Sequence, residues 1–371
     1  MVSLPGPLYA WRNALLSSPR FHRWAARFPL TRPIARKRAR QVFDITTGFV
    51  YSQVLLACVQ LQLFEKLRAG PRTIDDLAQE LKLPRKGAER LAKAAHSVGL
   101  LERRGPETYG LGVHGAAVLG NAGIGAMVEH HAMFYADLVD PVAMLRAEGP
   151  RETALSRYWA YALSDAPGKL EAGATADYTG LMSASQTLVA EEILDAYPLS
   201  KHRCLLDVGG GNGTFLISVA QRAPHLQLKL FDLPSVAEKA QVRFAEHGLS
   251  ARATAYGGSF RTDALPEGAD IISLVRIVHD HDDDVAKKIL RTARAALPPG
   301  GVLLIAEPLS ETPGAEPMGE AYFGFYLMAM GSGRPRSRYE LEGMLREAGF
   351  SRVRQIATRM PLQTSLIVAI A

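Results

Sequence analysis

The chain has 371 residues, of which 47% are hydrophobic and 22% are charged, so it is long enough to form two globular domains with separate cores. Its only two cysteines, Cys58 and Cys204, each lie in an apolar segment, which indicates small core residues in a reducing cytoplasm and excludes a disulfide framework. No secretion signal is visible, and the uninterrupted apolar runs are shorter than the ~20 residues of a membrane-spanning helix. These features predict a cytoplasmic protein.

The formal net charge of +6 resides in the first 40 residues. They hold nine of the 43 basic side chains and no acidic one, whereas the remainder holds 34 basic and 37 acidic side chains and carries −3. Among these charges lie Trp11, Phe21, Trp24 and Phe28, a composition typical of a segment on an anionic membrane surface. The same composition suits a segment that packs on a partner subunit equally well, and its positive charge would also attract nucleic acid. We therefore predict a basic aromatic arm over residues 1–40.

Residues 41–165 are predicted to form a mainly helical domain with a winged helix inside it. Thr73 can cap a first helix, a second is expected over residues 85–98, and LLERRGPETYGLG, residues 100–112, is typical of two short strands around a wing. A winged helix raises the alternative of DNA binding. Glu89 interrupts the basic residues of the second helix, and helical sequence continues on both sides, so we favour a dimerisation domain that binds no nucleic acid.

A linker rich in Ala, Gly and Pro at residues 163–173 is expected to end this domain, and strands and helices alternate after it. Strands are predicted at residues 204–208, 228–231, 271–275 and 302–306, and helices at 215–222, 236–246, 283–296 and 338–348. The last two runs, 353–356 and 364–370, indicate an antiparallel pair at a sheet edge. The fold class is therefore α/β, with a Rossmann-like sheet over residues 166–371, and the antiparallel ending is typical of a sheet of seven strands.

The most informative segment is LLDVGGGNGT, residues 205–214, which is followed by Asp232 in KLFDLP. An apolar strand runs into glycines that let the backbone turn sharply against a ligand, and Asp232 at the tip of the next strand can accept two ribose hydroxyls. A dinucleotide fingerprint would need a glycine where Thr214 stands, and Asp207 adds a carboxylate that repels pyrophosphate. The same carboxylate suits a cation. We predict S-adenosylmethionine as the ligand, with a nicotinamide oxidoreductase as the alternative.

Catalytic side chains are expected where strands end, because ligands of a doubly wound sheet lie beyond the carboxyl ends of its strands. His279 follows the strand at 271–275, and Glu307 follows the strand at 302–306. A carboxylate in contact with a histidine fixes its tautomer and stabilises the imidazolium, so we predict His279 as a general base. His281 is the competing candidate, and we expect it to face solvent.

The segment HDHDDD, residues 279–284, could also bind a divalent metal ion, since His and Asp are metal ligands. Aspartates at the beginning of a helix are favourable without any ion, because they face the positive end of the helix dipole. We therefore predict a site without metal.

These motifs, in this order, resemble those of the plant caffeate and acetylserotonin type of O-methyltransferases, which have DVGGG, FDLP, a histidine followed by aspartate and an AE glutamate. The resemblance covers residues 40–371 and implies a class I methyltransferase fold, with N-terminal helices that interlock in a homodimer and partly wall the partner's pocket. The site residues that it implies are Asp207, Gly209, Gly211 and Asp232 for the cofactor, His279 and Glu307 for catalysis, and Met182 for the acceptor pocket.

Two positions depart from the family pattern. Ser259 and Phe260 follow paired glycines where the family often has an aspartate near the adenine, which leaves that contact to a hydroxyl and a ring. The second glutamate that plant members place beside the histidine falls near Pro335. The resemblance therefore leaves the orientation of the histidine to Glu307 or Asp280.

Within the family, RWAARFPLTRPIARKRAR and AYFGFYLMAMGSGRPRS resemble the bacterial members that methylate tertiary hydroxyls of acyclic carotenoids. This resemblance implies a hydrophobic acceptor and gives the aromatic arm a purpose, because a polyene dissolved in the bilayer must be reached from the inner face of the membrane. Phenolic, polyketide or tetrapyrrole acceptors stay alternatives, since they need the same catalytic residues. A winged-helix regulator with an inactive methyltransferase domain is the alternative of another class.

Overall fold

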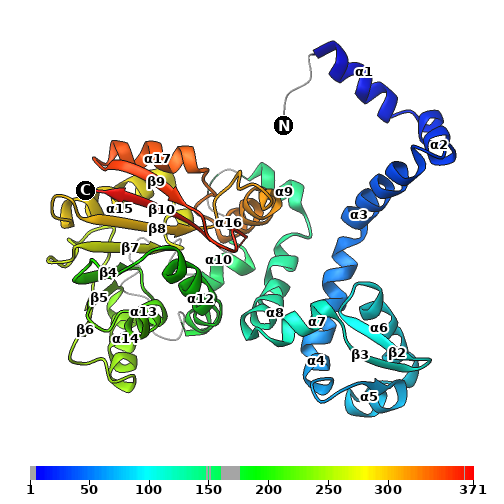
Figure 1. The fold of residues 1–371 in the computed structure, drawn as a ribbon, viewed down its shortest axis with the longest axis horizontal. Helices are drawn as coiled ribbons and strands as arrows, with labels where there is room; N and C mark the ends of the chain where they lie inside the picture. The colour runs from blue at the N-terminus through cyan, green and yellow to red at the C-terminus, as the bar shows by residue number, and fades with distance from the viewer. Residues whose placement is uncertain (1–5, 148, 150–151, 160–175, 363) are drawn as a thin grey trace. The chain divides into compact units, whose positions relative to one another are not determined.

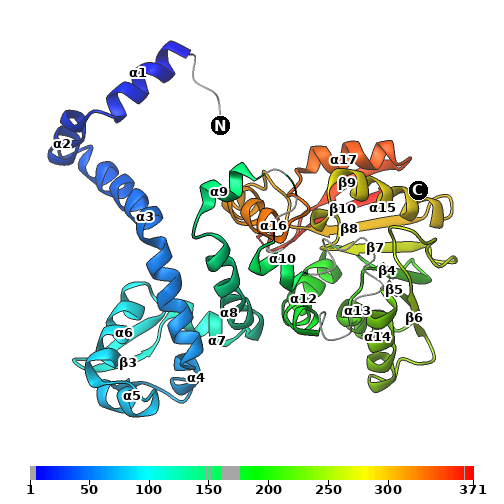
Figure 2. The ribbon, with the colours of Figure 1, turned by 180° about the vertical axis from the view of Figure 1, so that it is seen from behind.

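The computed structural model describes residues 6–147, 149, 152–159, 176–362 and 364–371, with the backbone alone for residues 122 and 176–185. The chain divides into two compact units, one up to Asn121 and one from Ala122 onward. Figures 1 and 2 show them from opposite sides.

The N-terminal unit is mainly helical. Its described helices are α1 (Gly6–Leu16), α2 (Pro19–Arg27), α3 (Arg32–Gln60), α4 (Leu63–Lys66), α5 (Ile74–Glu80), α6 (Arg85–Ser97) and α7 (Val113–Leu119). A small antiparallel sheet, in the order β1 (Arg72–Thr73), β3 (Thr108–Leu111) and β2 (Leu101–Gly105), completes the winged helix. The predicted helical domain with a winged helix inside it is confirmed.

Local sequence explains where the winged helix turns. Thr73 caps α5, because its hydroxyl accepts a hydrogen bond from the Asp76 amide at 3.2 Å while the Asp76 carboxylate accepts one from the Thr73 amide at 3.1 Å. Gly99, with φ of +75°, ends α6 in the left-handed conformation that favours glycine. Cys58 packs in the core of this unit with Phe64, as expected of a small apolar residue.

The C-terminal unit is built on a seven-stranded sheet in the order β6-β5-β4-β7-β8-β10-β9. The strands are β4 (Cys204–Val208), β5 (Gln227–Asp232), β6 (Ala253–Gly257), β7 (Ile271–Val275), β8 (Val302–Glu307), β9 (Ser351–Ile356) and β10 (Ser365–Ile370). Strands β4 to β8 are parallel, and β10 runs antiparallel between β8 and β9. The predicted Rossmann-like sheet with an antiparallel end is confirmed.

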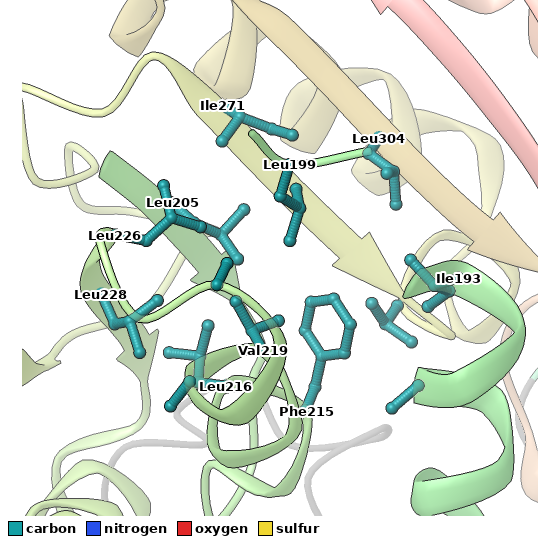
Figure 3. Packing of buried hydrophobic residues seen from close by; sticks show 14 of the residues in the cluster. Ile193, Leu199, Leu205, Phe215, Leu216, Val219, Leu226, Leu228, Ile271 and Leu304 are labelled. Atoms are coloured by element: carbon teal, nitrogen blue, oxygen red, sulfur yellow. The ribbon is translucent and has the colours of Figure 1, made fainter. Parts of the chain in front are cut away.

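Helices cover both faces of the sheet, because its central strands present apolar side chains to both sides. Leu205 and Leu228 face a core that α12, α13 and α14 complete (Figure 3), whereas Leu206 and Ile272 face a second core with α15 and α17. The bounds are α12 (Ala176–Ala196), α13 (Thr214–Arg222), α14 (Pro234–Glu246), the one-turn 3₁₀ helix η2 (Val278–Asp280), α15 (Asp283–Ala296) and α17 (Arg338–Glu347).

A third, aromatic core of this unit includes Phe134, Trp159 and Tyr326. It is built from α8 (Ala122–Asp137), α9 (Pro141–Arg146), α10 (Ala154–Tyr158), the π-helix η3 (Pro317–Phe323) and α16 (Gly324–Met330). Because α8 packs on α10, α12 and α16, residues 122–159 belong with the sheet, and this division differs from the boundary predicted after residue 165. The expected linker at residues 163–173 lies outside the described residues.

The basic arm comprises α1, α2 and the beginning of α3. Trp11, Trp24 and Phe28 are exposed, and the rings of Trp24 and Phe28 stack with their centroids 5.3 Å apart. Within the described part of the chain, α3 is long and apolar enough to cross a membrane by length and composition, with 6% of its apolar window buried. Asp44 and Gln53 interrupt this stretch, which is why the uninterrupted apolar runs of the sequence are shorter than a membrane span.

Candidate active site

The glycine-rich turn after β4 holds its backbone in the left-handed conformation that favours glycine. Gly209 and Gly211 have φ of +71° and +58°. A Cβ at Gly209 would lie 2.4 Å from Cδ1 of Ile277, so glycine is required there. The Gly209 amide donates to the Phe231 carbonyl at 2.8 Å, and the Gly211 amide donates to Oδ2 of Asp232 at 2.7 Å. The turn therefore ties the end of β4 to the end of β5.

Two carboxylates flank this turn. Oδ1 of Asp207 accepts a hydrogen bond from the Ser273 hydroxyl at 2.6 Å, whereas Oδ2 is buried without a hydrogen-bond partner. Burial raises the pKa of Asp207 to about 7 and that of Asp232 to about 6. An unpartnered carboxylate oxygen beside a tight turn fits a cationic group, and Asp232 at the tip of β5 fits hydroxyl groups. The residues present thus suit S-adenosylmethionine, whose sulfonium and ammonium are cations.

Helix η2, which follows β7, places His279 between two carboxylates. Its Nδ1 is hydrogen bonded to Oε2 of Glu307, and its Nε2 lies 3.0 Å from Oδ1 of Asp280. Burial by itself lowers the pKa of His279, but the charges of Glu307 and Asp280 outweigh it and raise the pKa to about 10. The imidazole is therefore cationic at neutral pH and bound at both nitrogens.

Glu307 also holds the backbone on which the histidine sits. Its Oε1 accepts hydrogen bonds from the amides of Ile277 at 3.0 Å and Val278 at 2.7 Å. Because Glu307 is the last residue of β8, one carboxylate joins that strand to the turn after the neighbouring strand β7. The two residues predicted for catalysis, His279 and Glu307, are thus in contact, as expected of neighbouring strand ends.

His281 is buried, so the prediction that it faces solvent is wrong. Its ring meets that of Phe260 edge-on at 5.3 Å, and a Cβ at Gly209 would lie 3.8 Å from Phe260. Burial lowers the pKa of His281 to about 4, which leaves the ring neutral. Ser259 donates its amide to Asp263 at 2.8 Å. Phe260, predicted to lie near the adenine, is therefore at the glycine turn with a neutral histidine beside it.

An aromatic cluster begins at Phe323, whose ring centroid lies 5.6 Å from that of His279. Met182 falls in α12, but its side chain lies outside the described residues, and its place in the acceptor pocket stays a prediction. Among the described residues, no group of three or more His, Cys, Asp or Glu side chains could hold a metal ion.

Glu307→Gln is expected to destabilise the fold by about 3 kcal/mol at pH 6, because it removes one partner of a buried ion pair. The pKa of His279 is raised in the folded protein, so the stabilisation is complete below pH 6.5 and disappears as pH rises through about 10. Urea titrations should therefore show that the free energies of unfolding of the native protein and of Glu307→Gln approach each other between pH 7 and pH 10. Glu311→Gln, at an exposed site, is the control; a difference that does not depend on pH would contradict the ion pair.

Comparisons with known proteins agree with this architecture. Residues 135–351 match an O-methyltransferase domain, and residues 43–119 match an O-methyltransferase dimerisation domain. The chain is 43% identical to demethylspheroidene O-methyltransferase of Cereibacter sphaeroides, over 96% of this chain and 93% of that one, and 40% identical to that of Rhodobacter capsulatus, over 98% and 90%. Human N-acetylserotonin methyltransferase in complex with S-adenosylmethionine shares the fold, with a TM-score of 0.73 and 22% identity over 90% of this chain and 97% of that one. The chain belongs to the family of S-adenosylmethionine-dependent O-methyltransferases and carries its dimerisation domain.

Proposed function

We propose that this chain methylates the tertiary hydroxyl of an acyclic carotenoid of the demethylspheroidene type, as a step of carotenoid biosynthesis. The observation that carries the proposal is the identity of 43% and 40% to two demethylspheroidene O-methyltransferases over nearly the whole chain. The arrangement of His279, with an aromatic core on one side and an acidic glycine turn on the other, supports the same reaction.

The cofactor side is assigned from the contacts of the glycine turn. Asp207, Gly209 and Gly211 would hold the methionine end, and Asp232 would hold the ribose. The adenine would lie against Ser259 and Phe260, which follow β6. When bound, S-adenosylmethionine supplies a methyl group on a positively charged sulfur. No metal ion has a part in this proposal.

His279 takes the proton of the acceptor hydroxyl. A tertiary alcohol is far too weak an acid to be ionised beforehand, so the proton must move to Nε2 as the carbon–oxygen bond forms. In the structure that nitrogen lies 3.0 Å from the Asp280 carboxylate. The reacting imidazole must therefore be the neutral form, which has lost its Nε2 proton to solvent, and the acceptor hydroxyl must take the place of Asp280 at Nε2. Glu307 stays on Nδ1 and stabilises the positive charge that the proton brings.

The surroundings of Phe323 on the side away from His279 suit a hydrocarbon chain because they are mainly aromatic, with Tyr322 and Tyr326 against its ring. His130 is hydrogen bonded to the hydroxyl of Tyr326 at 2.6 Å, and His131 to that of Tyr322 at 2.8 Å. Burial lowers the pKa of both histidines, that of His130 to about 4, so neither carries a charge at neutral pH. Both tyrosine hydroxyls are thus paired with a histidine, and Nδ1 of His130 is the buried atom here that has no hydrogen-bond partner among the described residues, so few polar groups face the acceptor and an apolar one is favoured.

The dimerisation domain indicates a homodimer, and we assign the basic arm to the membrane surface. Helix α2 begins at Pro19 and ends at Arg27, and it carries Arg20, Arg23 and Arg27 beside exposed Trp24. Basic residues bind anionic headgroups and exposed aromatic rings enter the interface, so the arm would bring a cytoplasmic enzyme to the inner face of the membrane.

The acceptor is tested with labelled S-adenosylmethionine, hydroxylated acyclic carotenoids and a panel of phenols. We expect methylation of the carotenoids, and a loss of about 10²- to 10⁴-fold in kcat for His279→Ala with unchanged S-adenosylmethionine affinity. His247→Ala, at an exposed site on the same unit, should match the native rate. Turnover confined to phenols would contradict the carotenoid acceptor, and an active His279→Ala variant would contradict the base.

Asp280→Asn should shift the pH dependence of the reaction. The Asp280 carboxylate raises the pKa of His279, so its removal lowers the pH at which kcat/KM reaches half its maximum, by about 1 unit or more. Asp284→Asn, which changes an exposed acid of the same segment, is the control. An unchanged profile would show that the rate does not report on the imidazole of His279.

Deletion of residues 1–38 should release the protein from anionic liposomes and leave the methylation of a detergent-dispersed acceptor largely intact. The reason is that the deletion removes the basic and aromatic side chains but none of the site. Lys86→Gln with Arg90→Gln, which removes exposed charge from the winged helix, is the control and should still bind. Liposome binding that survives the deletion would refute the role of the arm.

A further inference from the structure

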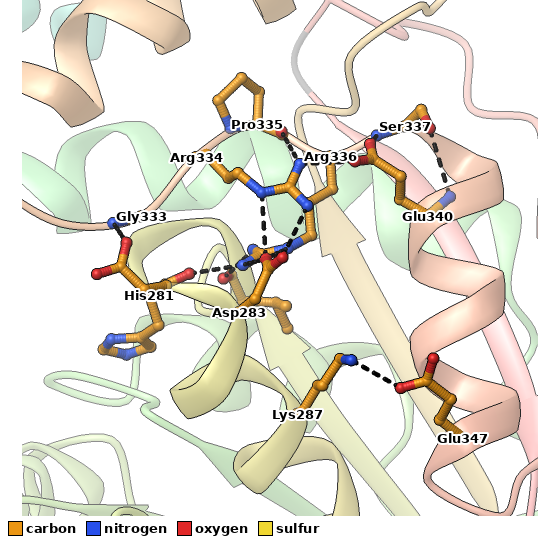
Figure 4. Close-up of polar contacts among 12 residues, drawn as sticks. His281, Asp283, Lys287, Gly333, Arg334, Pro335, Arg336, Ser337, Glu340 and Glu347 are labelled. Carbon is orange, nitrogen blue, oxygen red and sulfur yellow. Dashed lines mark hydrogen bonds and ion pairs between the residues drawn. The ribbon is translucent and has the colours of Figure 1, made fainter.

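A short segment between α16 and α17, residues 332–336, lies against the turn that carries His279 (Figure 4). It donates hydrogen bonds to four successive backbone carbonyls of that turn. The bonds are Arg336 Nη1 to Val278 at 2.8 Å, the Arg334 amide to His279 at 2.9 Å, Ser332 Oγ to Asp280 at 2.7 Å and Arg336 Nη2 to His281 at 2.8 Å. We call residues 332–336 the clasp.

Most of these carbonyls need partners from outside the turn. Helix η2 has only three residues, and within it the His281 amide donates to the Val278 carbonyl, at 3.4 Å, whereas the last carbonyls of a helix have no donor in the helix itself. The turn is also buried, so water does not replace the missing donors. The clasp therefore fixes the path of the backbone from Val278 to His281, and with it the point from which the imidazole of His279 projects.

Arg336 is the centre of the clasp. Its side chain is 2% exposed, although an arginine is seldom buried without a partner. Its Nη2 and Nε lie 2.7 Å and 3.1 Å from Oδ1 of Asp283, and Arg334 reaches the same carboxylate with Nη2 at 3.0 Å from Oδ2. Figure 4 shows both guanidinium groups converging on Asp283. The planar, rigid fork of donors lets Arg336 make four hydrogen bonds to two carbonyls and a carboxylate, one more than the three donors of a lysine allow.

Gly333 lets the clasp come this close. Its φ is +84°, and a Cβ there would lie 2.1 Å from the carbonyl oxygen of His279. Its amide donates to Oδ1 of Asp282 at 2.9 Å. Only glycine can combine this conformation with this approach.

We propose that Arg336 is a positioning residue for the methyl transfer, which acts by holding the backbone of residues 278–281 so that His279 stays between Glu307 and Asp280. The inference rests on the proposed role of His279 as the base. Pro335, at the position where plant members have a second glutamate, is then compatible with a working site.

The test compares Arg336→Lys with Lys287→Met. The control breaks the exposed ion pair between Lys287 of α15 and Glu347 of α17, in which Nζ and Oε2 lie 2.8 Å apart. Neither residue belongs to the clasp or to the turn that carries His279. We expect Arg336→Lys to lower kcat at least tenfold, with the dissociation constant of S-adenosylmethionine, measured by calorimetry, within threefold of the native value. The control should leave both unchanged. A kcat equal to that of the control would overturn the proposal, and so would a loss explained by weaker cofactor binding.

A second measurement separates positioning from general structural damage. In a His279→Ala background, Arg336→Lys should change the residual rate less than twofold, because a residue that acts through His279 has nothing left to position. Equal losses of rate in both backgrounds would overturn the proposed role of Arg336. An active His279→Ala variant would instead overturn the proposed role of His279 as the base. If Arg336→Lys does not fold, Ser332→Ala removes the bond to the Asp280 carbonyl alone; a loss of about threefold in kcat is expected, and none would contradict the proposal.

Discussion

An imidazole held between two buried carboxylates is the interaction on which the site depends. Glu307 and Asp280 reverse the effect of burial on the pKa of His279, and Glu307 binds the backbone amides of the turn as well as the ring. This arrangement requires that β7 and β8 be parallel neighbours with their carboxyl ends level. The strand order, the position of Glu307 at the end of β8 and the one-turn helix after β7 are therefore all needed to bring Glu307 into contact with His279.

Charge is distributed around this centre in a way that suits the reaction. Beside the glycine turn lie two acids whose pKa is raised by burial, Asp207 and Asp232, and a cation there would compensate the free Oδ2 of Asp207. In the aromatic core near Phe323, the described residues pair neutral histidines with tyrosines. A positive donor and an apolar acceptor would therefore meet at His279, whose Nε2 would take the proton.

Much of the sheet could be predicted because its central strands are mainly apolar and end at or next to Gly209, Asp232 and Glu307, the polar or glycine residues of the motifs. Strand β6 could not, since its residues are small or polar and mostly not buried. The contact of Glu307 with His279 followed from neighbouring strand ends. The burial of His281 did not, because it depends on Phe260 and on Arg336, which is distant in sequence. The assignment of α8 to the C-terminal unit likewise depends on tertiary packing that helical periodicity does not encode.

The central claim is that His279 is an imidazolium stabilised by Glu307 and Asp280 in the free protein. Nitrogen NMR of the full chain labelled at histidine, with His279→Ala to assign the resonance, measures this directly. The account predicts that both ring nitrogens of His279 carry protons at pH 7.5 and that the ring titrates near 10. A ring that is neutral at pH 7.5 and titrates near 6.5, the ordinary value, would contradict it.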